Sequence, residues 1–207
     1  MGDAFALLGE PRRPSLDTEQ LKVRFLALSS PVHPDRVHGA AAAERQAANA
    51  HYADLNAAYN RLREVRERLL HLYELEAGYS PRDIQRIPPG TMDLFVEVGQ
   101  VCRDCDAYLQ GRGTSTSPML RLKTFQEGLI WTDRLQGLQQ QVNLRRDALL
   151  SELAGMNEAW AAAPAPGKAG RLDALPLERL EQVYRALSYT ARWTEQIQER
   201  LVQLAVG

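Results

Sequence analysis

Residues 16–36 read LDTEQLKVRFLALSSPVHPDR and join a helical pattern to a proline-rich loop. Three apolar residues recur here at spacings of four and three, which places them on one face of a helix: Leu21, Phe25 and Leu28. Asp17 or Thr18 can cap the start of this helix. The next segment, SSPVHPDRVHGA, holds two prolines and a glycine, and a proline inside a helix removes a donor and clashes with the preceding turn. The stretch therefore predicts a helix over residues 18–28 that ends in a non-helical loop.

The flanking residues extend this pattern into a small helical module. A short amphipathic piece, residues 4–8, precedes the helix and stops at Gly9. After the loop, periodic apolar residues predict one longer helix: Tyr52, Leu55, Tyr59, Leu62, Leu69 and Leu72. The segment GYSPRDIQRIPPG then has three prolines and little periodicity. We therefore predict a first module over residues 1–78 and a linker over 79–90.

The remaining residues, 91–207, show three more helical patterns and no strand alternation. One apolar stripe consists of Leu94, Val98, Val101, Cys105 and Tyr108. A polar linker, QGRGTSTSP, separates it from a long pattern between Met119 and Trp160, which ends in the loop APAPGKAGRLDALP. The last helix has a heptad-like seam of Leu177, Leu180, Tyr184, Leu187, Ala191, Thr194 and Leu201. Three helices with facing seams predict an antiparallel bundle, so the chain as a whole is expected to be all-α in two modules.

Composition argues against several classes of partner. The 207 residues include 25 Lys and Arg against 26 Asp and Glu, so no overall charge attracts nucleic acid or an anionic membrane. No apolar run approaches the roughly 20 residues that cross a bilayer, and the N-terminus lacks a secretory pattern. The two cysteines fit a reducing compartment, where they stay thiols. We expect a cytoplasmic protein that binds neither nucleic acid nor membrane.

The loop contains the tripeptide His33-Pro34-Asp35, followed by Arg36. Pro34 fixes its own φ and pushes His33 into an extended conformation, so the loop presents both polar side chains at low entropic cost. Asp35 offers a carboxylate that an arginine of a partner can bind in bidentate fashion. The ring nitrogens of His33 can donate a hydrogen bond or hold the shape of the loop.

Together with ADLNAAYNRL at residues 53–62, this stretch resembles the J-domain of HscB-type co-chaperones for iron–sulfur cluster assembly. The resemblance implies that the loop docks on a heat-shock ATPase chaperone of the DnaK/HscA class and stimulates its ATP hydrolysis, with Lys22 and Arg24 as further contacts. Basic residues are scarcer before the loop than J-domains usually have, and Pro31 should end the preceding helix early. An alternative is therefore a J-like adaptor, or a J-domain protein with another client and weak stimulation.

The resemblance also implies a client site on the first helix of the bundle. Three apolar residues fall off the core stripe of that helix: Met92, Phe95 and Val96. HscB-type proteins hold their iron–sulfur scaffold on this helix, through apolar and acidic residues. LFVEVGQVCRD matches that motif at Phe95, Val96 and Glu97 but departs from it at Gly99, Gln100 and Arg103, while Tyr189 matches an aromatic position of the same surface. The predicted client site comprises Met92, Phe95, Val96, Gln100, Arg103 and Tyr189; alternatively, the first three pack against the N-terminal module.

We expect no catalytic residue, metal or cofactor in the chain. Cys102 and Cys105 supply two ligands where a zinc site needs about four, and residues three apart on a helix share a face, so both are interpreted as core residues. A hydrolase that uses His33 and Asp35 would need further ligands converging from other helices, and helix periodicity supplies no such set.

Overall fold

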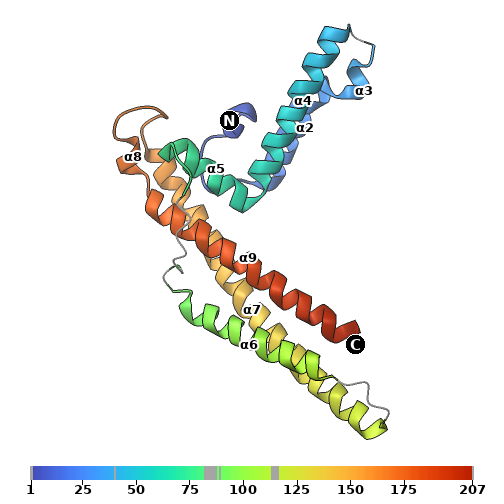
Figure 1. Ribbon diagram of the computed structural model, residues 1–207. Helices are drawn as coiled ribbons and strands as arrows, with labels where there is room; N and C mark the ends of the chain where they lie inside the picture. The colour runs from blue at the N-terminus through green and yellow to red at the C-terminus, as the bar shows by residue number, and fades with distance from the viewer. Residues whose placement is uncertain (1, 40, 82–87, 89, 113–116, 207) are drawn as a thin grey trace. The chain divides into compact units, whose positions relative to one another are not determined.

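The computed structural model describes residues 2–39, 41–81, 88, 90–112 and 117–206 (Figure 1). These residues form helices joined by turns and loops, and no strand occurs among them, so the all-α prediction is confirmed. In chain order the elements are α1 (Ala4–Leu7), α2 (Thr18–Ser29), the 3₁₀ turn η1 (Ser30–Val32), α3 (Pro34–Val37), α4 (Ala42–Arg63), α5 (Val65–Ala77), α6 (Met92–Gly111), α7 (Pro118–Ala162), α8 (Arg171–Ala174) and α9 (Leu177–Val206).

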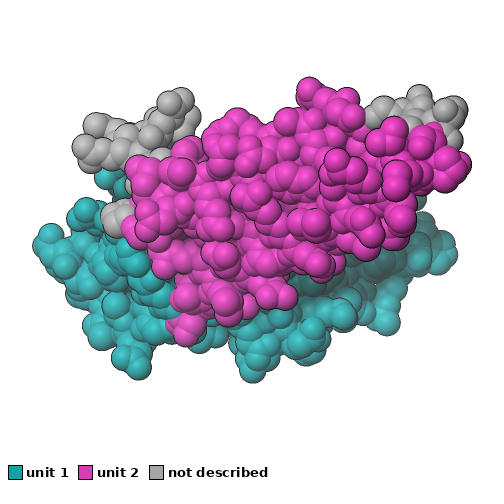
Figure 2. Space-filling view, turned by 90° about the horizontal axis from the view of Figure 1, so that it is seen from below, with its two compact units in different colours: residues 1–83, 152–184 teal, residues 84–151, 185–207 magenta. Residues whose placement is uncertain are grey.

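The chain divides into two compact units, which Figure 2 distinguishes by colour. Unit 1 consists of Met1–Asp83 and Glu152–Tyr184, and unit 2 of Ile84–Ser151 and Arg185–Gly207. The long helices α7 and α9 each contribute residues to both units. These ranges differ from the sequence-based division into a module over residues 1–78, a linker over 79–90 and a bundle over 91–207, which stays a prediction.

In unit 1, α2 and α4 pack side by side as a helical hairpin. The ring of Phe25 on α2 stacks on that of Tyr59 on α4, with centroids 4.5 Å apart. The short helix α1 packs on α4 as well, and the Ala4 N–H donates to Nε2 of His71 on α5 at 3.0 Å. The buried apolar side chains of this part of the unit include Phe5, Leu8, Leu16, Leu21, Leu55, Leu62, Leu69 and Leu72. Together they form the apolar core that holds α1, α2, α4 and α5 together.

The second helix of the hairpin was predicted as one continuous element, and this was wrong. It breaks at Glu64, whose backbone is extended (φ −82°, ψ 117°). The buried guanidinium of Arg68 lies at the break: Nη1 donates to the Leu62 carbonyl at 2.6 Å and Nε to the Pro14 carbonyl at 2.8 Å. In a continuous helix the Leu62 carbonyl would accept from the backbone four residues on. The arginine therefore satisfies an acceptor that the break frees, and its burial lowers the pKa of Arg68 to about 10.

Residues 152–184 join unit 1 through buried polar contacts. Arg171 forms a bidentate pair with Glu76 of α5, with Nε–Oε2 at 2.7 Å and Nη2–Oε1 at 2.6 Å. Ser15 donates its N–H to the Asn157 side chain and accepts a hydrogen bond from it in return, each at 3.0 Å. These contacts join residues far apart in the sequence, so apolar periodicity does not predict them.

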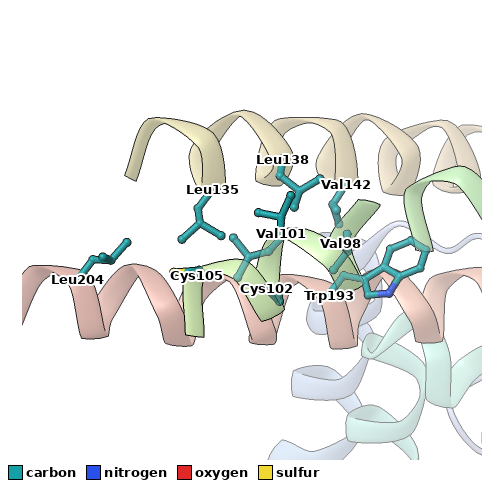
Figure 3. Packing of buried hydrophobic residues seen from close by; sticks show 10 residues of the cluster. Val98, Val101, Cys102, Cys105, Leu135, Leu138, Val142, Trp193 and Leu204 are labelled. Carbon is teal, nitrogen blue, oxygen red and sulfur yellow. The ribbon is translucent and has the colours of Figure 1, made fainter. Parts of the chain in front are cut away.

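In unit 2, α6, α7 and α9 form a three-helix bundle in which α7 runs antiparallel to the other two (Figure 1). Its core lies between the three helices (Figure 3) and contains Val98, Val101, Cys102, Cys105, Leu135, Leu138, Val142, Trp193, Ile197 and Leu204. The stripe predicted for α6 is confirmed, since Val98, Val101 and Cys105 are buried and both its ends are half-buried.

The seam predicted for α9 was right in part, since Leu180 and Leu187 are buried. Tyr184, Ala191 and Thr194 are only half-buried. The other residues that this helix buries form a stripe beside the predicted seam: Val183, Ala186, Thr190, Trp193, Ile197 and Leu204. Thr190 hides this stripe from a search for apolar residues, but its hydroxyl donates to the Leu187 carbonyl at 3.0 Å and so needs no other partner.

Candidate functional site

The His33–Asp35 loop has the backbone geometry that its prolines predict. Helix α2 ends at Ser29, and Pro31 lies in the 3₁₀ turn that follows. His33 is extended (φ −60°, ψ 135°), and Pro34 is the first residue of α3. The predicted effects of the two prolines are therefore confirmed.

His33 anchors the loop from both sides. Its Nδ1 accepts a hydrogen bond from the Asp35 backbone N–H at 3.2 Å, so it caps α3. Its ring also meets Tyr52 of α4 edge to face, with centroids 5.1 Å apart. Because Nδ1 is the acceptor, the neutral ring keeps its proton on Nε2, which remains a donor. Tyr52 was expected to be only a member of an apolar stripe; its role in positioning His33 has no signature in the sequence.

Asp35 is a charged group of the loop that is almost fully exposed. Its side chain is 90% exposed, and Oδ2 lies 3.6 Å from Nδ1 of His33. Pro34 and Arg36 are exposed beside it. A carboxylate in this position is open to a bidentate arginine.

The two basic residues predicted to flank the site differ in their surroundings. Lys22 is exposed on α2. Arg24 is bound within its own module, because its Nε lies 3.0 Å from Oε1 of Glu10 and its guanidinium also contacts the Gly9 carbonyl. Arg24 thus ties α2 to the segment before it.

A second candidate site is a groove of about 380 Å³ between α6 and α9 in unit 2. It is lined by Phe95, Val96, Val98, Gly99, Arg103, Tyr189, Arg192, Trp193 and Gln196. Phe95 meets Tyr189 edge to face at a centroid distance of 6.1 Å, and Tyr189 contacts Trp193 at 5.8 Å.

The groove brings together four of the six residues predicted for the client site: Phe95, Val96, Arg103 and Tyr189. Met92 is 53% exposed and Gln100 is also exposed, but neither lines the groove. Sequence reasoning did not assign Arg192, Trp193 and Gln196 to this site. The error in the predicted seam of α9 explains the omission, because Trp193 belongs to the stripe that α9 buries and Arg192 and Gln196 lie next to that stripe.

Cys102 and Cys105 lie in the core of unit 2, as predicted. Burial raises the pKa of both thiols. Arg200 closes the core beside them, with Nη2 2.6 Å from Oδ2 of Asp106 and Nε donating to the Cys102 carbonyl at 3.3 Å. In the described residues no three His, Cys, Asp or Glu side chains come together as metal ligands do. None of the helices described has a segment long and apolar enough to span a membrane.

Comparisons with known proteins point to one family. The co-chaperone HscB homolog of Bordetella pertussis is 43% identical over 76 residues, which are 37% of this chain and 44% of that protein. The homolog of Bordetella petrii is 40% identical over the same length. The match spans less than half of these curated relatives. No family model matches the chain.

Structural similarity to solved HscB proteins covers nearly the whole chain. HscB from Vibrio cholerae superposes with a TM-score of 0.56 at 19% identity, covering 98% of this chain and 99% of that one. Human HscB superposes with a TM-score of 0.60 at 18% identity, covering 96% of this chain and 81% of the human protein. The resemblance predicted from residues 16–36 and 53–62 is therefore confirmed: the chain is similar in sequence and in fold to HscB co-chaperones.

Proposed function

We propose that the chain is a co-chaperone in iron–sulfur cluster assembly. Its His33–Asp35 loop stimulates the ATPase of a DnaK/HscA-class chaperone, and its bundle holds a scaffold protein as client. The observation that carries the proposal is the loop, in which a helix cap and an aromatic contact position His33 beside the exposed carboxylate of Asp35. The likeness to HscB co-chaperones supports it.

The proposed chemistry takes place on the partner. Asp35 binds an arginine of the chaperone, Nε2–H of His33 is available as a donor, and the ordered loop loses little entropy when it docks. ATP hydrolysis itself uses the chaperone's own residues, so this chain needs no catalytic group or cofactor. The proposed location is the cytoplasm, where a reducing environment keeps Cys102 and Cys105 as thiols.

Substitutions in the loop test the first half of the proposal. Asp35→Asn keeps the shape of the side chain and removes its charge, and it should return the chaperone's ATP hydrolysis to the unstimulated rate. Because Asp35 is 90% exposed, the free energy of unfolding should change by less than about 0.5 kcal/mol. His33→Gln should have the same effect on the rate. His51→Gln, at an exposed histidine next to Tyr52, is the matched control and should stimulate normally. Normal stimulation by Asp35→Asn would place the working surface elsewhere.

The groove on the bundle is the proposed client site. Its aromatic contact joins Phe95 of α6 to Tyr189 of α9, and Phe95 is 39% exposed, as a residue that can bury more surface on binding should be. Phe95→Ser with Tyr189→Ala should weaken binding of an iron–sulfur scaffold by roughly a thousandfold, because interfacial aromatic anchors often contribute 2 kcal/mol or more each. Titration calorimetry measures this. Binding equal to that of the parent, in a variant with intact helicity, would exclude the groove.

The state of Arg24 favours a second candidate, an adaptor with weak stimulation. If Glu10 and the Gly9 carbonyl hold this guanidinium, α2 offers a chaperone less positive charge than its sequence suggests. An ATPase rate that rises little at saturating co-chaperone, together with unchanged client binding, would select the adaptor.

A further inference from the structure

Two arginines border the groove, one from each helix. Arg103 of α6 and Arg192 of α9 both line it, and both are exposed. Within the described residues neither forms an ion pair, and no acidic side chain is among those that line the groove. The charged side chains that line the groove are therefore positive, and they lie beside aromatic and aliphatic side chains.

A local arrangement on α6 holds Arg103 in this position. Its Nη2 donates to Oε1 of Gln100 at 2.8 Å, and the Gln100 amide in turn donates to Oδ1 of Asp104 at 2.7 Å. A Cβ placed on Gly99 would lie 3.3 Å from Nη1 of Arg103, so a side chain there would require the guanidinium to shift by a few tenths of an ångström. The three positions at which this helix departs from the family motif thus act together: Gly99 leaves room, Gln100 supplies the acceptor, and Arg103 supplies the charge.

From this arrangement we infer that the groove binds a client segment in which apolar residues alternate with carboxylates. Its apolar side chains contact Phe95, Val96 and Trp193, and its carboxylates bind Arg103 and Arg192, which are suited to bidentate pairing. A basic segment is rejected, because juxtaposed like charges are unfavourable. The inference rests on the proposed client-binding function and specifies the chemistry of the client.

Two fluorescently labelled peptides test this chemistry on the full chain. Both have the same pattern of Leu and Phe; one has Glu at every other position and its counterpart has Lys. Fluorescence anisotropy should show that the Glu peptide binds at least about tenfold more tightly than the Lys peptide, and that added salt reduces the difference. Arg103→Glu with Arg192→Glu should reverse the preference.

Matched controls separate the groove from overall charge. Arg121→Glu with Lys123→Glu makes the same change in net charge on α7, which does not line the groove, and should keep the preference for the Glu peptide. Gly99→Leu should weaken binding of the Glu peptide, since its side chain crowds the guanidinium of Arg103 without altering charge.

Each outcome bears on the inference independently of the proposed function. Equal affinity for the two peptides, preference for the Lys peptide, or binding of neither by the parent chain would overturn it, as would a preference that survives in the double arginine variant. ATPase stimulation by the parent, measured without peptide, reports the co-chaperone function separately. If the chain selects the Glu peptide but does not stimulate the chaperone, the inference about the groove is supported and the proposed co-chaperone function is contradicted.

Discussion

The two units bury different kinds of contact. Unit 1 buries charged and polar groups, among them the Glu76–Arg171 pair and the Arg68 guanidinium, alongside its apolar residues. The core cluster of unit 2 consists of aliphatic side chains, two thiols and Trp193, and the polar residues buried in the described part of this unit, Thr91 and Thr190, are uncharged. Removing one partner of a buried ion pair lowers the free energy of unfolding by much more than the intact pair contributes to it, because the other charge stays buried. In an apolar core, the loss of stability grows with the volume of the side chain that is deleted. The units should therefore respond differently to single substitutions.

The largest effect should come from breaking the buried pair. Arg171→Met leaves the Glu76 carboxylate, 2% exposed, with only the distant Arg12 guanidinium at 4.0 Å, and should cost about 3–5 kcal/mol. Hydrogen exchange should show lost protection in residues 1–81. Arg179→Met, which breaks the more exposed pair with Glu152, should cost less than about 1 kcal/mol. Similar losses in the two variants would mean that burial does not distinguish these pairs.

A cavity in the apolar core should have a somewhat smaller effect. Leu138→Ala removes a side chain that is 2% exposed and should cost about 2–4 kcal/mol, with protection lost in the bundle. Leu144→Ala changes the same residue type on the same helix at a position that is 71% exposed, and should stay within about 0.5 kcal/mol. Urea denaturation measures both changes in the free energy of unfolding. A change for Leu138→Ala as small as that for Leu144→Ala would contradict the burial described for the core of unit 2.

The smallest effect should be a dependence of stability on pH that arises in unit 1. Burial, followed by the positive charge of Arg61, lowers the pKa of His71 below its ordinary 6.5. As the pH falls through about 6.5, His71 becomes protonated in the unfolded chain but stays neutral in the folded chain. The free energy of unfolding therefore decreases as the pH is lowered, until the pH reaches the lowered pKa of the folded state. Thermal unfolding at successive pH values should show a smaller loss in His71→Gln, whose amide oxygen can still accept from the Ala4 N–H. Identical pH dependence in the two proteins would rule out His71 as the source.

The sequence was sufficient to predict the elements that depend on local rules. Proline chemistry predicted the end of α2 and the extended His33, and apolar spacing predicted the core stripe of α6. It failed where a long-range polar contact decides the structure. Arg68 permits the break at Glu64, and Arg171 ties residues 152–184 to α5; neither contact leaves a periodic signal.

The groove illustrates the same limit at a functional surface. Phe95 and Val96 were predicted because they lie off an apolar stripe, which is a property of one helix. Arg192 and Gln196 required knowledge of how α9 faces α6, and Thr190, a buried polar residue, disguised that orientation. The groove lies between two helices that are far apart in the chain, so the sequence predicts only some of the residues that line it.

The most direct test of the account is single-turnover ATP hydrolysis by a DnaK-class chaperone in the presence of three proteins: the parent chain, Asp35→Asn, and Phe95→Ser with Tyr189→Ala. Without client, the parent and the groove variant should accelerate hydrolysis equally, and Asp35→Asn should leave it at the unstimulated rate. Acceleration by Asp35→Asn, or none by the parent, would contradict the assignment of the His33–Asp35 loop as the ATPase-activating surface.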